Sequence, residues 1–171
     1  FYKTSMKITS TALQDCFILE PTIFRDSRGH FFESYNQRTF HALSGFDVTF
    51  VQDNQALSQY GTVRGLHFQQ GEFAQAKLVR VLQGRVLDVA VDLRKDSATY
   101  MQHIAVELSA ENNLQLFVPR GFAHGYSVLE DHTIFHYKCD NYYLKESEGG
   151  INVLDKTLNI DWRIAEKDML I

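Results

Sequence analysis

A strict alternation of side-chain character is the sequence feature that most constrains the fold. Over residues 82–93 (LQGRVLDVAVDL), a period of two places Leu87, Val89, Val91 and Leu93 on one face of an extended strand, and Val86, Asp88, Ala90 and Asp92 on the other. A charged side chain that points into a protein needs a partner or a ligand. We therefore expect Asp88 to point to the interior. For Asp92, an interior and a solvent-exposed position remain equally open.

Runs with the same period of two recur along the chain, separated by glycines and polar turns. They lie at residues 48–54, 62–68, 77–82, 103–108, 115–119, 125–130 and 133–138. One short helix is expected at residues 36–45 (NQRTFHALSG), with Asn36 as a candidate N-cap and Gly45 beyond its end. A short helical tail is expected within residues 151–171. Many short strands with little helix predict a mainly β fold, an antiparallel sandwich or barrel.

Length, charge and cysteine content narrow the class of protein. With 171 residues and no evident linker, residues 1–171 are expected to form a single domain. A formal net charge of −4 argues against nucleic acid or a membrane surface as a partner, and no apolar run has the length of a membrane span. Cys16 and Cys139 form no CxxC pair, which suits a reducing cytoplasm. A cytoplasmic protein is therefore expected.

Two fragments, RGLHFQ and VPRGFAHG, each place one histidine where proteins of the cupin superfamily hold a metal ligand. The second fragment matches the cupin motif PxGxxH in full through Pro119, Gly121 and His124. In the first fragment, Gln69 stands where metal-binding cupins have a second histidine after His67. The chain thus resembles a cupin-type antiparallel jelly-roll barrel that has lost its metal, and no metal or cofactor is expected.

The residues around these histidines suit proton transfer next to a carbonyl group. A neutral imidazole accepts a carbon-bound proton near neutral pH. A cation such as Lys77 stabilises the enolate, and the phenol of Tyr137 can protonate the opposite face. Arginines such as Arg64 bind phosphate oxygens, and Tyr142 and Tyr143 can stack on a nucleobase.

The motifs DxRGxFFE, RGLHFQ, KLVR, VPRGFAHG and YKCxNYY, in this order, resemble the dTDP-4-dehydrorhamnose 3,5-epimerase family. The resemblance extends from about Ile18 to Trp162. It implies a metal-independent isomerase that inverts C3 and C5 of a dTDP-4-keto-6-deoxy hexose for dTDP-L-rhamnose synthesis. It further implies that His67 is the general base, Tyr137 the general acid and Lys77 the cation at the C4 oxygen.

The same resemblance implies a set of substrate-binding residues and a partner chain. The implied substrate contacts are Arg28, Glu33, Gln52, Asp53, Asn54, Arg64, Lys77, His124 and Glu148. Family members are dimers whose N-terminal strands pair across the subunits. A homodimer is therefore implied, in which Arg28 and Glu33 serve the site of the neighbouring subunit.

The sequence departs from the family at the carboxylate that supports the base. In the family, an aspartate in a C-terminal Leu-Ser-x-Lys-Asp motif pairs with the base, and an apolar run precedes that motif. Here the apolar residues MLI follow Asp168. Three alternatives stay open: the chain is cut short before the motif, Asp168 takes the role, or Asp88 supports His67.

Three other functions also stay open. A C3-only or C5-only epimerase of a related nucleotide sugar would keep the same base and acid. A non-catalytic cupin would bind the sugar nucleotide without proton exchange. A metal-dependent cupin oxygenase is the third alternative, and Gln69 argues against it.

Overall fold

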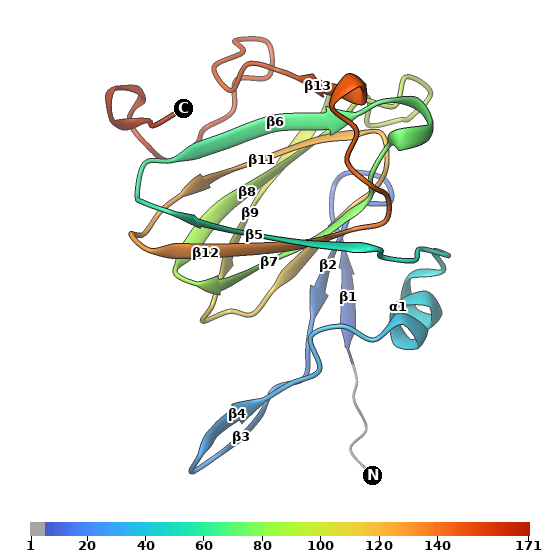
Figure 1. Ribbon diagram of the computed structural model, residues 1–171, viewed down its shortest axis with the longest axis vertical. Coiled ribbons are helices and arrows are strands. Elements are labelled where there is room, and N and C mark those ends of the chain that lie inside the picture. Colours follow the sequence, from blue (N-terminus) through green and yellow to red (C-terminus); the bar gives the residue numbers. More distant parts are fainter. Residues whose placement is uncertain (1–5) are drawn as a thin grey trace.

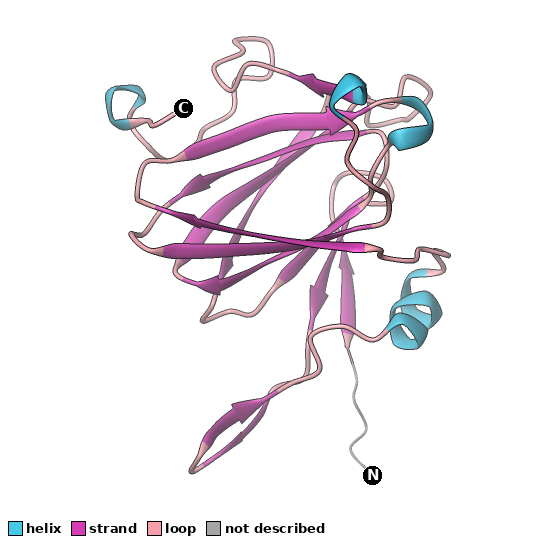
Figure 2. Ribbon diagram, viewed as in Figure 1, coloured by secondary structure: helices cyan, strands magenta, loops and turns pink. Residues whose placement is uncertain are grey.

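Antiparallel strands dominate the computed structural model, which describes residues 6–171 (Figures 1 and 2). The strands are β1 (Lys7–Ser10), β2 (Phe17–Glu20), β3 (Phe24–Asp26), β4 (Gly29–Phe31), β5 (Gln52–Ser58), β6 (Val63–Gln69), β7 (Lys77–Gln83), β8 (Arg85–Asp92), β9 (His103–Ser109), β10 (Gln115–Val118), β11 (Phe122–Val128), β12 (Thr133–Cys139) and β13 (Glu148–Gly150). The helices are α1 (Gln37–Ser44) and the 3-10 turns η1 (Gly71–Phe73), η2 (Lys145–Ser147) and η3 (Glu166–Asp168).

The strands form two large sheets and one small hairpin. The six-stranded sheet has the order β1-β2-β10-β7-β12-β5, and the five-stranded sheet has the order β13-β6-β11-β8-β9. This arrangement confirms the predicted mainly β, jelly-roll-type antiparallel fold. Within the described residues, hydrogen bonds join strands inside each sheet and do not close a continuous barrel.

The main core lies between the two large sheets. It contains Val79 and Phe135 from the six-stranded sheet and Val86, Ala90 and Tyr126 from the five-stranded sheet, all at most 5% exposed. Removing this much apolar surface from water is the main driving force for folding. Val86 and Ala90 belong to this core because the even-numbered residues of β8 point towards the six-stranded sheet.

The opposite face of β8 is buried as well. Its apolar residues pack against the C-terminal segment, in which Trp162 is 2% exposed and donates a hydrogen bond from Nε1 to the Val153 carbonyl at 2.7 Å. Asp88 is fully buried, which confirms its predicted interior position. Asp92 is also fully buried, so the solvent-exposed alternative for this residue is wrong.

The predicted helix is confirmed as α1, with both of its expected ends. The Asn36 side chain accepts a hydrogen bond from the Thr39 backbone N–H at 3.1 Å. Gly45 ends the helix with φ of 71°, a left-handed conformation that favours glycine. Phe40 anchors the helix, because it is fully buried in a third apolar cluster beside Phe117.

Two expectations need correction. Residues 48–51 belong to no strand, and the strand predicted there begins at Gln52. The predicted helical tail contains only the 3-10 turn η3, because residues 151–169 lie across the sheet and β-bridge pairing of Leu170 with Thr62 fixes the end of the chain. Within residues 6–171, no helix is long and apolar enough to cross a membrane.

Candidate active site

A cavity of about 800 Å³ is lined by strands of both large sheets. His67 comes from β6 in the five-stranded sheet, whereas Lys77 and Tyr137 come from β7 and β12 in the six-stranded sheet. The alternation along each strand turns these three side chains inward. The three predicted catalytic residues therefore line one cavity, and they reach it from two different sheets.

Tyr137 and Lys77 lie close together on the six-stranded sheet. Lys77 Nζ is 5.5 Å from the centre of the Tyr137 ring, which is a cation–π distance. Burial raises the pKa of the Tyr137 phenol, although a hydrogen bond with Asn54 opposes the shift. The phenol therefore keeps its proton at neutral pH and is available as a donor.

Burial shifts the pKa of Lys77 in the opposite direction to that of Tyr137. It lowers the pKa of the ammonium, while the nearby Cys139, Asp88 and Glu148 raise it in part. An ammonium with little water around it interacts strongly with any negative charge that develops beside it. Lys77 is thus suited to hold an oxyanion in the cavity.

The carboxylate beside His67 is Glu148, for which the family resemblance implied a substrate contact. His67 Nδ1 and Glu148 Oε1 are 3.1 Å apart. Asp88 instead shares a 2.8 Å hydrogen bond with His124. Asp168 lies in η3 and does not line the cavity. In the described chain, neither Asp88 nor Asp168 supports His67 by a direct contact.

Asp88 and His124 form a buried pair, of which His124 lines the cavity. Burial raises the pKa of the Asp88 carboxyl, and the bond to His124 opposes this shift. The His124 ring also stacks on Phe135, with ring centres 6.1 Å apart. His124 lines the cavity in a fixed orientation, as its predicted substrate contact requires.

Among the other predicted substrate-binding residues, Gln52, Asn54 and Arg64 line the same cavity. Arg64 Nε donates a hydrogen bond to Ser58 Oγ at 3.2 Å, which holds its guanidinium along the cavity wall. Gln52 Nε2 donates to Asn54 Oδ1 at 3.1 Å. These side chains offer hydrogen-bond donors and one fixed positive charge, the groups that bind phosphate and base edges.

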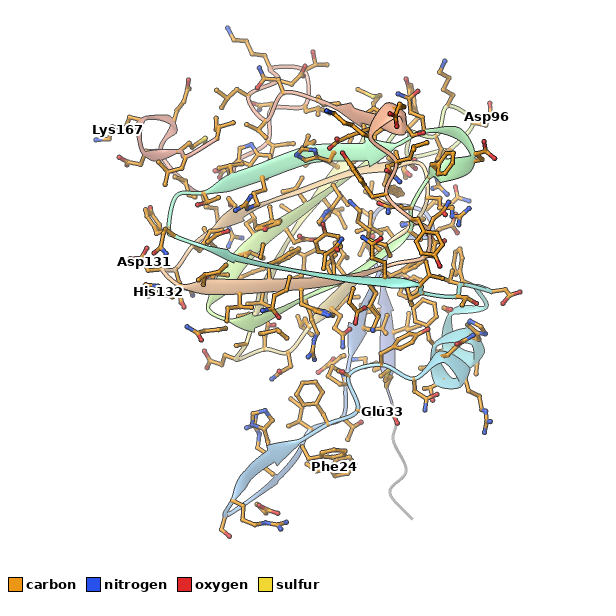
Figure 3. All side chains as sticks on the ribbon, viewed as in Figure 1. Phe24, Glu33, Asp96, Asp131, His132 and Lys167 are labelled. Atoms are coloured by element: carbon orange, nitrogen blue, oxygen red, sulfur yellow. The ribbon has the colours of Figure 1, made fainter. Side chains whose placement is uncertain are left out.

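The structure does not bring Asp53, Arg28 and Glu33 into this cavity. Asp53 lies on the opposite face of β5 and pairs with Lys138, whose Nζ is 3.0 Å from Asp53 Oδ1. Arg28 is at the tip of the β3–β4 hairpin, which projects away from both sheets in Figure 1, and it pairs with Asp26. Figure 3 shows Glu33 on the segment that follows this hairpin.

Gln69 fills the position at which metal-binding cupins have a histidine. Its Nε2 donates hydrogen bonds to the carbonyls of Phe73 and Tyr142, at 2.7 and 3.1 Å. Its Oε1 accepts a hydrogen bond from the Leu144 backbone N–H at 2.7 Å. All of these contacts serve the adjoining loop. Within residues 6–171, no group of three or more His, Cys, Asp or Glu side chains is arranged to hold a metal ion.

Tyr126, which the sequence reasoning did not single out, also lines the cavity. It is 5% exposed, stacks on Phe135 with ring centres 3.9 Å apart, and burial raises the pKa of its phenol to about 12. The alternation in residues 125–130 gives its direction. That pattern alone does not distinguish a cavity wall from the core.

Comparison with known proteins gives one consistent family. A sequence model of the dTDP-4-dehydrorhamnose 3,5-epimerase family matches residues 10–171. The enzyme of that name from Salmonella typhimurium is 53% identical over 161 residues, which cover 94% of this chain and 88% of the relative.

Two solved structures are similar over nearly the whole chain. The dTDP-4-dehydrorhamnose 3,5-epimerase of Elizabethkingia anophelis has a TM-score of 0.94 at 56% identity, covering 96% of this chain and 90% of that one. The dTDP-6-deoxy-D-glucose-3,5-epimerase of Legionella pneumophila, in complex with dTDP-4-keto-L-rhamnose, has a TM-score of 0.91 at 47% identity and covers 95% and 86%.

Proposed function

The chain belongs to the dTDP-4-dehydrorhamnose 3,5-epimerase family, and we propose that it inverts C3 and C5 of a dTDP-4-keto-6-deoxy hexose with His67 as base and Tyr137 as acid. It is an isomerase of the dTDP-L-rhamnose route. We assign the activity to one domain that comprises residues 1–171.

The observation that carries the assignment of roles is the position of His67 and Tyr137 on different sheets of one cavity. Inversion at carbon requires that a proton leave one face of the sugar and that another arrive at the opposite face. Two groups on facing walls meet this requirement, whereas two groups on one strand do not. The bound dTDP-4-keto-L-rhamnose in the Legionella relative supports a keto sugar as the occupant.

The proposed reaction runs through an enolate next to the C4 carbonyl. His67 takes the proton from C3, the C–H electron pair forms the C3–C4 double bond, and the C4 oxygen becomes negative beside Lys77. Tyr137 then gives its proton to the opposite face of C3 as the carbonyl forms again. Solvent returns a proton to the phenolate and removes one from the imidazolium. The same sequence at C5 completes the double inversion.

We assign the nucleotide to the remaining cavity wall. Arg64 and His124, with Gln52 and Asn54, supply donors for the diphosphate and the base. For Arg28 and Glu33, the proposed role is in the cavity of a partner subunit, because the hairpin carries them away from their own cavity. This role requires a homodimer.

Asp53 keeps a proposed substrate contact through its backbone, since its side chain pairs with Lys138 on the far face of β5. We place the protein in the cytoplasm, where its two free, buried cysteines would stay reduced. The proposal includes no metal, no cofactor, no nucleic acid and no membrane as a partner.

The test uses dTDP-4-keto-6-deoxyglucose in deuterated water, followed by proton NMR. The proposal expects the signals of H3 and H5 to disappear, and reduction of the product to trap the rhamno configuration. Loss at one carbon only would identify a single epimerase. Binding of dTDP without any exchange would identify a non-catalytic sugar-nucleotide protein.

A further inference from the structure

The hydrogen bond between Ser58 and Arg64 joins the two large sheets beside the cavity. Ser58 is the last residue of β5 in the six-stranded sheet, and Arg64 belongs to β6 in the five-stranded sheet. Arg64 Nε donates to Ser58 Oγ at 3.2 Å. The arginine of one sheet is therefore held by a hydroxyl of the other.

The turn between these two strands is fixed by backbone hydrogen bonds. The N–H of the buried Gly61 donates to the Val128 carbonyl at 3.0 Å, and the Gly61 carbonyl accepts from the Leu170 N–H at 2.9 Å. A buried turn that is bonded on both sides opens less readily than a free loop. The backbones of Ser58 and Arg64 thus keep a constant separation, and the long arginine side chain is the part that the hydroxyl must hold.

Ser58 can act on a ligand only through Arg64. It is 6% exposed and does not line the cavity, whereas Arg64 is exposed and lines it. Within residues 6–171, Nη1 and Nη2 of Arg64 have no hydrogen-bond partner. These two nitrogens form a planar fork of N–H groups, the geometry that binds two oxygens of a phosphate.

Tyr126 holds the Ser58 hydroxyl from its other side. Tyr126 lies directly opposite Arg64 in the pairing of β11 with β6, and its ring stacks on Phe135 with ring centres 3.9 Å apart. Burial raises the pKa of the Tyr126 phenol to about 12, while the charge of Arg64 and a hydrogen bond with Ser58 oppose this shift. A serine hydroxyl that accepts from an arginine can give its own proton to a phenol oxygen. The three side chains thus form a chain of hydrogen bonds that ends at the guanidinium.

The charge of Arg64 also reaches the opposite wall of the cavity. Burial raises the pKa of the Tyr137 phenol, and Arg64 opposes this shift although it lies on the other sheet. The guanidinium therefore points into the space between the sheets. An anionic group that enters this space meets a positive charge whose direction is already set.

We propose that Ser58 is the positioning residue of Arg64, that Tyr126 fixes the Ser58 hydroxyl, and that both aim the guanidinium at the diphosphate of the sugar nucleotide. This role rests on the nucleotide-binding function proposed above. A long side chain that is free in the unliganded protein loses rotamer freedom when it binds. The Ser58 hydroxyl orders the arginine before the ligand arrives, and this lowers the cost of binding.

Thymidine and dTDP distinguish this role from a general effect on the fold, because they differ only in the diphosphate. NMR titration gives a dissociation constant for each ligand. The ratio of the thymidine constant to the dTDP constant is the phosphate preference of the protein. A positioning role changes this ratio, whereas a looser cavity weakens the binding of both ligands alike.

The variants are Ser58→Ala, which removes the acceptor, and Tyr126→Phe, which removes the hydroxyl behind it. We expect Ser58→Ala to raise the dTDP dissociation constant about 3- to 10-fold, the fold-change of one ordinary hydrogen bond, and to leave that of thymidine unchanged. Tyr126→Phe should lower the phosphate preference by a smaller factor. Ser127→Ala is the matched control, because Ser127 is equally buried but donates to the Trp162 carbonyl at 2.8 Å, away from the cavity. Its phosphate preference should equal that of the unchanged protein.

A double-mutant cycle shows whether Ser58 acts through Arg64. Arg64→Ala alone should raise the dTDP dissociation constant roughly 10- to 100-fold, the range of hydrogen bonds to a charged group. In that background, Ser58→Ala should change the constant by less than about twofold. An equal effect of Ser58→Ala with and without the arginine would overturn the proposal. So would an equal loss of affinity for thymidine and dTDP.

A second readout needs no ligand. The Nε–H signal of Arg64 in ¹H–¹⁵N spectra is identified by its absence in Arg64→Lys, and ¹⁵N relaxation reports its order. We expect an ordered Nε–H in the unchanged protein and a more mobile one in Ser58→Ala and Tyr126→Phe. A mobile Nε–H in the unchanged protein would overturn the proposal, even if Ser58→Ala failed to fold.

These outcomes also separate this inference from the proposed activity. If dTDP binding depends on Ser58 as expected but neither C3 nor C5 exchanges its proton, the epimerase activity fails and the positioning role stands. If both protons exchange and Ser58→Ala leaves the phosphate preference unchanged, only the positioning role fails.

Discussion

Replacement of Asp92 by asparagine should destabilise the fold strongly at neutral pH and much less in acid. Asp92 ends β8 and is fully buried. Its Oδ1 accepts hydrogen bonds from the backbone N and Nε of Arg94, both at 3.0 Å. Its Oδ2 accepts from Arg94 Nη2 at 3.0 Å, Ser97 Oγ at 2.6 Å and Thr99 Oγ1 at 2.7 Å. The carboxylate thus fastens the turn that follows the strand.

The expected magnitude follows from these five contacts. An asparagine amide keeps one acceptor oxygen and turns an NH₂ group towards donors that already point at it. Removing one partner of a buried charge pair costs about 3–5 kcal/mol, and we expect a loss of about that size for Asp92→Asn at pH 7.

The pH dependence has a definite sign. Burial by itself raises the pKa of the Asp92 carboxyl, but the hydrogen bonds from Arg94, Ser97 and Thr99 outweigh it and hold the pKa well below its usual range. A carboxyl with a depressed pKa stabilises the fold above the unfolded pKa of about 3.9. The difference in free energy of unfolding between the parent protein and Asp92→Asn should therefore shrink by about 1.4 kcal/mol per pH unit below pH 4.

Urea unfolding followed by the fluorescence of Trp162, the one tryptophan of the chain, measures this difference. Asp96→Asn is the control, because Asp96 is exposed in the same turn and is labelled in Figure 3. A loss below about 1 kcal/mol at pH 7, the size of an ordinary neutral hydrogen bond, would refute the reasoning. So would a difference between variant and parent that stays constant from pH 7 to pH 3.

Three further predictions follow from single contacts. Lys77→Met should slow proton exchange about 10²- to 10³-fold. In the unchanged protein, the exchange rate should decline with a midpoint below pH 10.5, the ordinary pKa of lysine, because burial lowers the pKa of Lys77. A midpoint at or above pH 10.5 would contradict this. Gly125→Ala should cost about 1–3 kcal/mol in urea unfolding, because its Cβ would lie 2.6 Å from the Arg64 carbonyl oxygen; an unchanged midpoint would contradict it. Trp162→Ala should cost about 3–5 kcal/mol yet leave dTDP binding in calorimetry intact, because Trp162 packs on the far side of β8.

The sequence predicted the strands well where a strict alternation reports burial of one face. Whether Asp92 is buried or exposed could not be predicted, because alternation gives the direction of a side chain and not which elements cover it. The covering elements here are the turn at residues 93–99 and its Arg94. The same alternation in residues 52–54 directs the Asp53 side chain to one face of the strand and those of Gln52 and Asn54 to the other face. A single cavity therefore could not receive all three side chains.

The partner of His67 was beyond the reach of sequence patterns. Glu148 approaches it through a strand of Glu-Gly-Gly, a composition that carries no strand signal. Glycine stands at position 149 because a Cβ atom there would lie 2.5 Å from the Phe68 ring, which is a tertiary constraint. Two carboxylates that the sequence offered lie elsewhere in the fold: Asp88 bonds to His124, and Asp168 lies in η3.

The central claim, that His67 and Tyr137 act on opposite faces of the sugar, is tested most directly with Tyr137→Phe in deuterated water. Because the His67 side chain is 54% exposed, its proton exchanges with solvent and can return as deuterium to the face from which it came. We expect proton NMR to show loss of the H3 or H5 signal, while reduction of the recovered sugar still yields the uninverted configuration. Inverted product formed at the rate of the unchanged protein would contradict it.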